Sequence, residues 1–248
     1  MDKVLVVTGG SRGIGAEIVR QAAGQGWVVV FSYLHRAEDA AAVVRDVTAA
    51  GGRAVAVQAD SAREEDVTRL FEEAARHGRI AGLVNNAGIN STALNPGPAR
   101  VADLKAESVR RMLEVNVVGA FMCAAEAVRR MSTARGGQGG AIVNIGSAAT
   151  WLWGATERVH YAASKAAVNA LSHGLALEVG REGIRVNCLH PGLITTTMNP
   201  PDRVARITPM IPVGRAGEPG EIAAAMLFLL SDAASYVHGA ELRVTGGR

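Results

Sequence analysis

The sequence predicts an α/β protein built on a doubly wound parallel sheet of about seven strands, with helices on both faces. Short apolar, β-branched runs alternate with stretches of helical periodicity along the whole chain. The runs are almost continuously hydrophobic, as in Val4-Leu-Val-Val and Val28-Val-Val-Phe, which is expected where helices cover both faces of a sheet. The chain has 248 residues and no repeat, long linker or break in composition. We therefore expect one domain, residues 1–248.

The predicted elements alternate in kind, beginning with a strand from Lys3 to Thr8 that ends in glycines. The strands expected after it are 27–33, 53–58, 81–85, 141–145, 185–189 and 241–244. The expected helices are 13–25, 37–50, 63–77, a long stretch from about 101 to 131, 159–179 and 219–230. Such alternation requires right-handed crossovers between parallel strands.

Composition and charge favour a small-molecule protein over a nucleic-acid or membrane protein. The net charge of +3 comes from Lys and Arg scattered among acids, a pattern that suits an anionic small ligand and does not indicate nucleic acid. Cys123 and Cys188 lack CxxC spacing and the six His are dispersed, so we expect free thiols in a reducing compartment and no metal site. A strand beginning at Lys3 and the lack of a long apolar run predict a soluble, cytoplasmic protein without a signal peptide.

The turn after the first strand is predicted to bind a dinucleotide. It reads Thr8-Gly9-Gly10-Ser11-Arg12-Gly13-Ile14-Gly15. Gly9 permits a sharp exit from the strand, Gly13 lets the backbone approach a pyrophosphate, and Gly15 allows helix and sheet to pack closely. The amino terminus of the helix then offers free N–H groups. The spacing is GxxxGxG, a variant of the usual fingerprint, and a turn that serves only packing is the alternative.

Cofactor choice is predicted from the end of the second strand. The segment Ser32-Tyr33-Leu34-His35-Arg36 holds no acid of the kind that binds the ribose hydroxyls of NAD. Arg12 and Arg36 would bind a 2′-phosphate, because guanidinium matches phosphate oxygens bidentately, and Ser32 and Tyr33 would add hydroxyl donors. We expect NADP in preference to NAD; the alternative is a solvated Arg36 at the start of a helix.

Tyr161 and Lys165 stand four residues apart on the predicted helix 159–179, which places both on one face. A phenol titrates near ~10 and is a poor acid or base at neutral pH unless a cation stabilises its phenolate. Lys165 is such a cation. Taken alone, this spacing more often marks two exposed helix residues than a catalytic pair, so other motifs must decide.

These motifs occur together in one order and spacing. They are Thr8-Gly9 with Gly13-Ile14-Gly15, Asn85-Asn86-Ala87-Gly88, Asn116, Ser147, Tyr161 with Lys165, and Pro191-Gly192. The arrangement resembles the short-chain dehydrogenase/reductase family from about Lys3 to Gly247. Within it, the chain looks most like the subgroup of 3-oxoacyl-carrier-protein reductases and bacterial glucose dehydrogenases. The resemblance implies a Rossmann-type fold and an NAD(P)-dependent oxidoreductase that acts on a carbonyl or secondary alcohol.

The resemblance also implies catalytic roles. Tyr161 would be the general acid or base, and Lys165 would lower its pKa and bond the nicotinamide ribose. Ser147 would hold the substrate oxygen, and Asn116 would hold a water that relays protons to the lysine. Each residue alone also fits a structural role: Ser147 as a cap, Asn116 as a polar helix residue and Lys165 as a surface charge.

Further cofactor residues are implied by the same resemblance. Asp60 would accept a hydrogen bond from the adenine amino group, and Ser61 would supply a backbone N–H. Three residues would pass close to the adenine ribose: Asn86, Ala87 and Gly88. The segment expected to bind the nicotinamide carboxamide contains Pro191, Gly192, Ile194 and Thr195, with Thr197 as a substitute for Thr195. Ser11 and Ile14 complete the expected cofactor set in the glycine turn.

The substrate side is predicted less fully. Trp151 and Trp153 follow Ser147 and would line the site of an apolar or ring-shaped substrate. The alternative is packing at a subunit interface or beneath a loop. Residues 193–213, which include Met198, are expected to close over the substrate. Arg206 in this segment fits an anionic substrate or plain solvation. Small alanine faces on the helix 159–179 fit the homotetramers common in the family.

Three functions remain open from the sequence. The first is an NADP-dependent carbonyl reductase or alcohol dehydrogenase. The second is a family member that uses NAD or performs a non-redox reaction. The third is a dinucleotide-binding regulatory protein that has lost catalysis.

Overall fold

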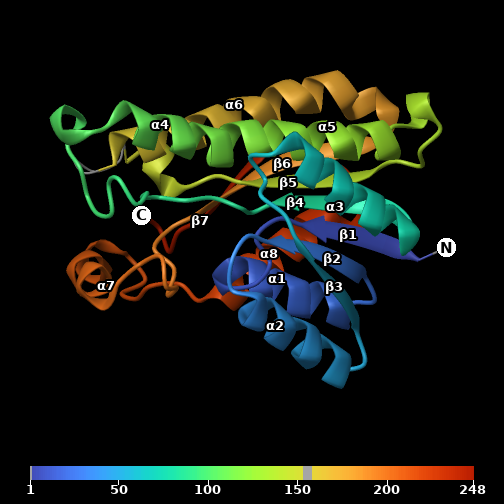
Figure 1. Ribbon diagram of the computed structural model, residues 1–248, viewed down its shortest axis with the longest axis horizontal. Helices are drawn as coiled ribbons and strands as arrows, with labels where there is room; N and C mark the ends of the chain where they lie inside the picture. Colours follow the sequence, from blue (N-terminus) through green and yellow to red (C-terminus); the bar gives the residue numbers. More distant parts are fainter. Residues whose placement is uncertain (1, 153–157) are drawn as a thin grey trace.

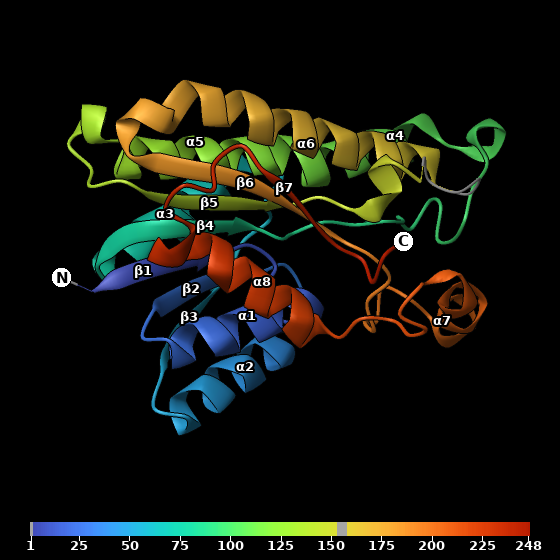
Figure 2. The ribbon, with the colours of Figure 1, turned by 180° about the vertical axis from the view of Figure 1, so that it is seen from behind.

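Seven parallel strands form one sheet at the centre of the computed structural model, which describes residues 2–152 and 158–248 (Figures 1 and 2). The strand order is β3-β2-β1-β4-β5-β6-β7, and every neighbouring pair is parallel. The strands are β1 (Lys3–Val7), β2 (Val28–Tyr33), β3 (Arg53–Gln58), β4 (Arg79–Asn85), β5 (Gly140–Ile145), β6 (Ile184–Pro191) and β7 (Glu241–Val244). The predicted α/β class with a doubly wound parallel sheet is confirmed.

Helices cover both faces of the sheet (Figures 1 and 2). One face carries α1 (Gly13–Gly24), α2 (Ala37–Ala49) and α8 (Pro219–Leu230). The other carries α3 (Glu64–Arg76), α4 (Ala106–Leu113), α5 (Gly119–Met131) and α6 (Val159–Val179). Alternate residues of β1 belong to opposite cores: Leu5 and Val7 to the first, Val4 and Val6 to the second. Burial on both sides is why the strands are continuously apolar.

The structure corrects the prediction of one long helix from 101 to 131. That stretch contains a 3₁₀ turn (Val101–Asp103), α4, a π-helical turn (Glu114–Val118) and α5. A single π turn inside a helix is rare, and a large share of the known examples lie at functional sites. Here the turn places the buried Asn116 against the loop that follows β4. The other predicted elements are present, with ends that shift by one or two residues.

The order of the sheet reverses between β1 and β4, so the loops after these strands diverge and leave a crevice at their carboxyl ends. The short helix α7 (Pro201–Ile207) and the chain end at Arg248 lie at this side of the molecule, opposite the amino terminus (Figure 1). None of the described helices is both long enough and apolar enough to span a membrane.

Candidate active site

The glycine turn between β1 and α1 is closely packed. Gly9 and Gly13 have φ of 67° and 53°, a left-handed conformation that favours glycine. A Cβ on Gly15 would lie 2.2 Å from the Gly9 carbonyl oxygen. The Asn86 side-chain amide donates hydrogen bonds to the carbonyls of Thr8 and Gly9, each at 2.9 Å. The turn therefore holds one shape that exposes the first N–H groups of α1.

We expect Gly15→Ala to damage this turn. The added methyl has to displace the Gly9 backbone, which should destabilise the fold by about 1–3 kcal/mol and weaken dinucleotide binding. Gly24→Ala, at the other end of the same helix, is the matched control because nothing lies within 4 Å of its Cβ. Chemical unfolding and a fluorescence titration with NADPH measure both effects. Equal behaviour of the two variants would show that the turn tolerates a side chain.

The predicted 2′-phosphate residues divide into two kinds. Ser32 is buried, and its hydroxyl accepts a hydrogen bond from the Gly9 N–H at 3.1 Å. This contact supports the turn and leaves the O–H of Ser32 as a donor. Tyr33 is half-buried and packs against the core on the sheet face that carries α1, α2 and α8. Arg12 and Arg36 are exposed at the amino ends of α1 and α2. Arg36 has a φ of 63° and lies 3.5 Å from Asp39.

The loop after β3 places Asp60 beside α4. Its carboxylate accepts hydrogen bonds from the Arg111 guanidinium at 2.8 Å and from the Ala62 N–H at 2.9 Å. Each carboxylate oxygen can accept more than one hydrogen bond, so these contacts leave capacity for an adenine amino group. Ser61 is buried beside Gly119, where an added Cβ would lie 2.6 Å from the Ser61 carbonyl oxygen. The adenine roles of these residues stay predictions.

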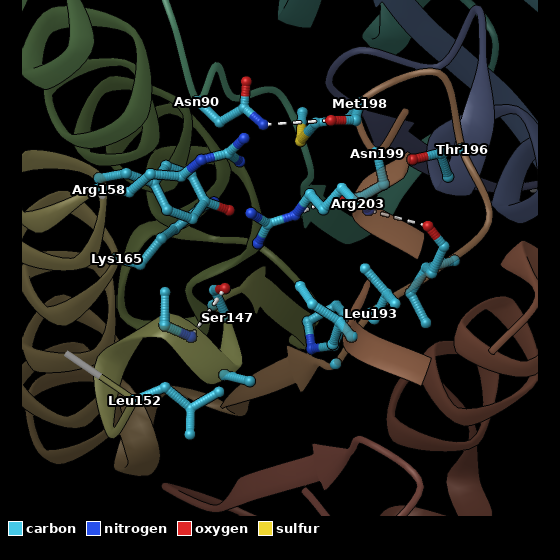
Figure 3. Close-up of a pocket in the computed structure, with 18 of the residues that line it drawn as sticks. Asn90, Ser147, Leu152, Arg158, Lys165, Leu193, Thr196, Met198, Asn199 and Arg203 are labelled. Carbon is cyan, nitrogen blue, oxygen red and sulfur yellow. Dashed lines mark hydrogen bonds between the residues drawn. The ribbon is translucent and has the colours of Figure 1, made fainter. Parts of the chain in front are cut away.

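Ser147, Tyr161 and Lys165 line one pocket of about 360 Å³ beyond the carboxyl ends of β5 and β6 (Figure 3). Ser147 follows β5, and its hydroxyl caps a 3₁₀ turn by accepting from the Ala149 N–H at 3.1 Å. Tyr161 and Lys165 come from the first turns of α6. The structure therefore brings together the three residues that the sequence singled out.

Lys165 is almost fully buried, and its ammonium donates to the Ile145 carbonyl at 2.8 Å. Burial lowers the pKa of this amine to about 8. Burial raises the pKa of the Tyr161 phenol, while the hydrogen bond with the Ser147 side chain and the charges of Arg158 and Arg203 act in the opposite direction. Near neutral pH the pocket thus holds a protonated phenol beside a cation.

Asn116 ties the π turn to the loop that follows β4. Its Oδ1 accepts from the Ile89 N–H at 2.8 Å, and its Nδ2 donates to the Ile89 carbonyl at 2.9 Å and the Ser164 hydroxyl at 3.0 Å. A Cβ on Gly88 would lie 3.3 Å from Asn116 Oδ1 and 3.4 Å from Lys165 Nζ. Asn116 is therefore adjacent to the lysine, although it does not line the pocket.

Part of the predicted cofactor set lines the pocket: Ile14, Asn86, Gly88, Tyr161, Lys165, Pro191, Gly192 and Ile194. The rest does not: Gly9, Ser11, Arg12, Gly13, Gly15, Ser32, Tyr33, Arg36, Asp60, Ser61, Ala87 and Thr195. The choice of Thr195 needs correction. Thr195 is exposed and its N–H bonds the Gly217 carbonyl, whereas Thr196 lines the pocket.

The predicted substrate residues also divide. Met198 lines the pocket with Leu152, Leu193 and Met210, but Trp151 does not. The Trp151 ring packs edge-on against His190, with centroids 5.5 Å apart, and the Arg243 guanidinium lies 4.2 Å from its centre. These contacts hold the indole between one side chain of β6 and one of β7. Trp153 lies outside the described residues.

Sequence reasoning missed Arg158 and Arg248 among the lining residues, whereas Arg203 lies in the segment 193–213 that was expected over the substrate. The Arg158 and Arg203 guanidiniums reach toward the centre of the pocket (Figure 3). Arg203 donates to the Asn199 side chain at 3.2 Å. Arg158 precedes the first residue of α6 and has a non-helical backbone, with φ of −149° and ψ of 43°, so helical spacing from Tyr161 could not have indicated it. No sequence signal pointed to Arg248.

Comparisons with known proteins agree with this geometry. The model of the family described as "Enoyl-(Acyl carrier protein) reductase" matches residues 9–248. The chain is 44% identical over 250 residues to the "Uncharacterized oxidoreductase YgfF" of Escherichia coli (strain K12), with 99% of each covered. The solved short-chain dehydrogenase/reductase from Serratia marcescens BCRC 10948 is 36% identical and superimposes with a TM-score of 0.91, covering 99% of this chain and 97% of that one. The chain belongs to the short-chain dehydrogenase/reductase family.

A second solved relative carries a dinucleotide. The blue fluorescent protein from a metagenomic library, solved in complex with NADPH, is 37% identical, with a TM-score of 0.89 over 99% of this chain and 97% of that one. The resemblance seen in the sequence motifs is therefore confirmed at the level of the family, and the chain is an oxidoreductase of the short-chain dehydrogenase/reductase family.

Proposed function

We propose that this short-chain dehydrogenase/reductase transfers a hydride between NADP(H) and a carbonyl or secondary alcohol, with Tyr161 as general acid and base. The observation that carries the proposal is the convergence of the Tyr161 phenol, the Ser147 hydroxyl and the Lys165 ammonium in one pocket beside the glycine turn. A phenol in such surroundings is poised for proton transfer to an oxygen atom.

The residues present fit a dinucleotide. The glycine turn leaves a cradle that a Cβ would fill, and the pocket continues past Gly88 to Lys165. Gly13 and Gly15 would hold the pyrophosphate, Lys165 the nicotinamide ribose, and Ile194 with Thr196 the nicotinamide end. When bound, the cofactor supplies the hydride donor or acceptor.

The protein's own groups supply the proton and the orientation. Ser147 and Tyr161 would hydrogen-bond the same substrate oxygen and so fix the carbonyl carbon. In reduction, the Tyr161 hydroxyl gives its proton to that oxygen as charge develops there. The Lys165 cation stabilises the phenolate that remains. Asn116, through its bonds to the Ile89 backbone, keeps the loop beside Lys165 in place.

We expect a preference for NADP, supported by the exposed guanidiniums of Arg12 and Arg36. Arg36→Asn should weaken NADPH binding about 10-fold, the usual scale of a lost charge-assisted contact, and should leave NADH binding nearly unchanged. Asn tolerates the left-handed conformation of residue 36, so the backbone is preserved. Arg12→Ala should act in the same direction. Fluorescence titrations with both cofactors measure this. Wild-type protein that binds NADH as tightly as NADPH would reject the preference and favour the NAD-dependent alternative.

A substrate panel tests the function itself. The pocket mixes apolar side chains with guanidiniums, so the panel should contain neutral ketones, sugars and keto acids, each with NADPH or with NADP⁺ and the matching alcohol. Turnover with any of them supports the proposal. Tight NADPH binding without turnover of any compound in the panel would favour a dinucleotide-binding regulatory protein that has lost catalysis. The homotetramer, the cytoplasmic location and closure of residues 193–213 over the substrate remain predictions of the family resemblance.

A further inference from the structure

His190 is a fully buried side chain in contact with the catalytic serine, and the mechanism above does not use it. It stands at the end of β6, immediately before Pro191. Its Nδ1 lies 3.1 Å from the Ser147 nitrogen and 3.3 Å from the Ser147 carbonyl oxygen. Its Nε2 lies 3.2 Å from Asn169 Oδ1 and 3.7 Å from the Glu241 carboxylate.

The neighbouring hydrogen bonds determine which ring nitrogen carries the proton. The Asn169 amide group donates to the Glu241 carboxylate at 2.8 Å, so Asn169 Oδ1 is the acceptor that faces His190. Nε2 therefore carries a hydrogen and donates to Asn169. In the neutral ring Nδ1 then has a lone pair, which accepts the Ser147 N–H.

Packing holds the imidazole in this orientation. A Cβ on Gly146 would lie 2.4 Å from His190 Nδ1, so only glycine fits before the serine. Trp151 covers the ring edge-on, and Arg243 in turn covers Trp151. The ring therefore has no room to turn. Side chains from β7 and α6 hold it in contact with Ser147.

We propose that His190 is a positioning residue: its Nδ1 fixes the backbone of Ser147, and thereby holds the serine hydroxyl beside Tyr161, while Glu241 and Asn169 fix the tautomer of the ring. The inference rests on the proposed function, because it concerns how that site keeps its geometry. A serine that drifts by about an ångström costs a large factor in rate, up to about 100-fold.

Burial keeps the His190 ring neutral, although charged groups surround it. Glu241 and Arg243 face it from β7, and Lys165 faces it from α6. Burial, the largest influence, lowers the pKa of His190 below its ordinary value, with Glu241 and the Ser147 backbone acting in the opposite direction. A protonated Nδ1 could no longer accept the Ser147 N–H and would donate to the Ser147 carbonyl oxygen instead. The neutral form is therefore the one that accepts the Ser147 N–H.

Two substitutions separate positioning from bulk packing. His190→Asn keeps an acceptor near the place of Nδ1, whereas His190→Leu keeps the volume and removes the acceptor. We expect His190→Leu to lower kcat about 10- to 100-fold, and His190→Asn to stay within about fivefold of wild type, both with unchanged NADPH affinity. His173→Leu is the control, since it removes another, exposed partner of Glu241 and should leave kcat unchanged. Equal losses in the Asn and Leu variants, or full activity in the Leu variant, would overturn the proposal.

A measurement independent of turnover distinguishes this failure from failure of the proposed function. In protein with ¹⁵N-labelled histidine, the NMR signals of His190 are assigned by their absence in the Asn variant. They should show the neutral Nε2–H tautomer at neutral pH. A charged ring or the Nδ1–H tautomer at neutral pH would overturn the role of His190 whether or not a substrate has been found.

Discussion

Tyr161→Phe should lower kcat by about 10²- to 10⁴-fold, the range that general acid–base groups contribute. The change removes one oxygen atom and keeps the ring that lines the pocket, so NADPH affinity should stay nearly unchanged. Because burial raises the pKa of the phenol, wild-type enzyme should oxidise alcohols faster as pH rises and the phenolate forms. The variant should lack this pH dependence.

The measurement for Tyr161 is steady-state kinetics beside a titration with NADPH. Tyr236→Phe is the control, because Tyr236 is fully exposed and the same atom is lost without touching the pocket. A Tyr161→Phe enzyme that keeps wild-type kcat would remove the general acid from the proposed mechanism. If the variant no longer binds NADPH, the Tyr161 hydroxyl contributes to cofactor binding as well.

Lys165→Met should abolish most of the activity and yet stabilise the fold near neutral pH. The pKa of about 8 for the buried ammonium against about 10.5 in the unfolded chain corresponds to a destabilisation of about 3 kcal/mol. Methionine removes that burial cost but leaves the Ile145 carbonyl without its donor, which costs about 1–3 kcal/mol. We therefore expect a net gain in the free energy of unfolding of up to about 2 kcal/mol.

The pH dependence of the free energy of unfolding shows whether the charge of Lys165 causes this difference in stability. Between about pH 8 and the ordinary lysine pKa, the unfolded chain binds a proton that the folded protein has released, so wild-type stability rises with pH. The variant lacks this increase, and its advantage should shrink across the same window. Denaturant unfolding at fixed protein concentration measures the difference, with Lys105→Met, at an exposed lysine, as the control. A difference that does not change with pH would rule out the charge of Lys165 as its origin.

The fold class and the catalytic group could be predicted because their signals are local. A buried strand is apolar wherever it lies in a parallel sheet, and Gly9, Gly13 and Gly15 mark a strand-to-helix turn through backbone sterics alone. Tyr161 and Lys165 share a helix face by spacing. Ser147 could be assigned to the site from its position just after β5, because the carboxyl ends of parallel strands meet at one edge of the sheet, where ligands bind.

Other features depend on partners that are distant in the chain. The π turn at Asn116 is supported by bonds to Ile89 and Ser164, which helix periodicity cannot reveal. For Trp151, substrate contact and packing were both open from the sequence, and the structure packs its ring between His190 and Arg243. Thr195 and Thr196 differ by one residue in an irregular segment, where spacing does not give the direction of a side chain.

The central claim is that this pocket couples proton transfer from Tyr161 to hydride transfer from NADPH. Its most direct test uses NADPH with deuterium at the nicotinamide position that is transferred, together with the carbonyl compound from the panel that reacts fastest. The experiment measures whether the deuterium appears in the alcohol product. Mass spectrometry of the alcohol product should show one deuterium for each NADPH consumed in wild-type protein, and product formation should nearly cease in Tyr161→Phe. Product that forms without deuterium, or that forms equally fast in both proteins, would contradict the account.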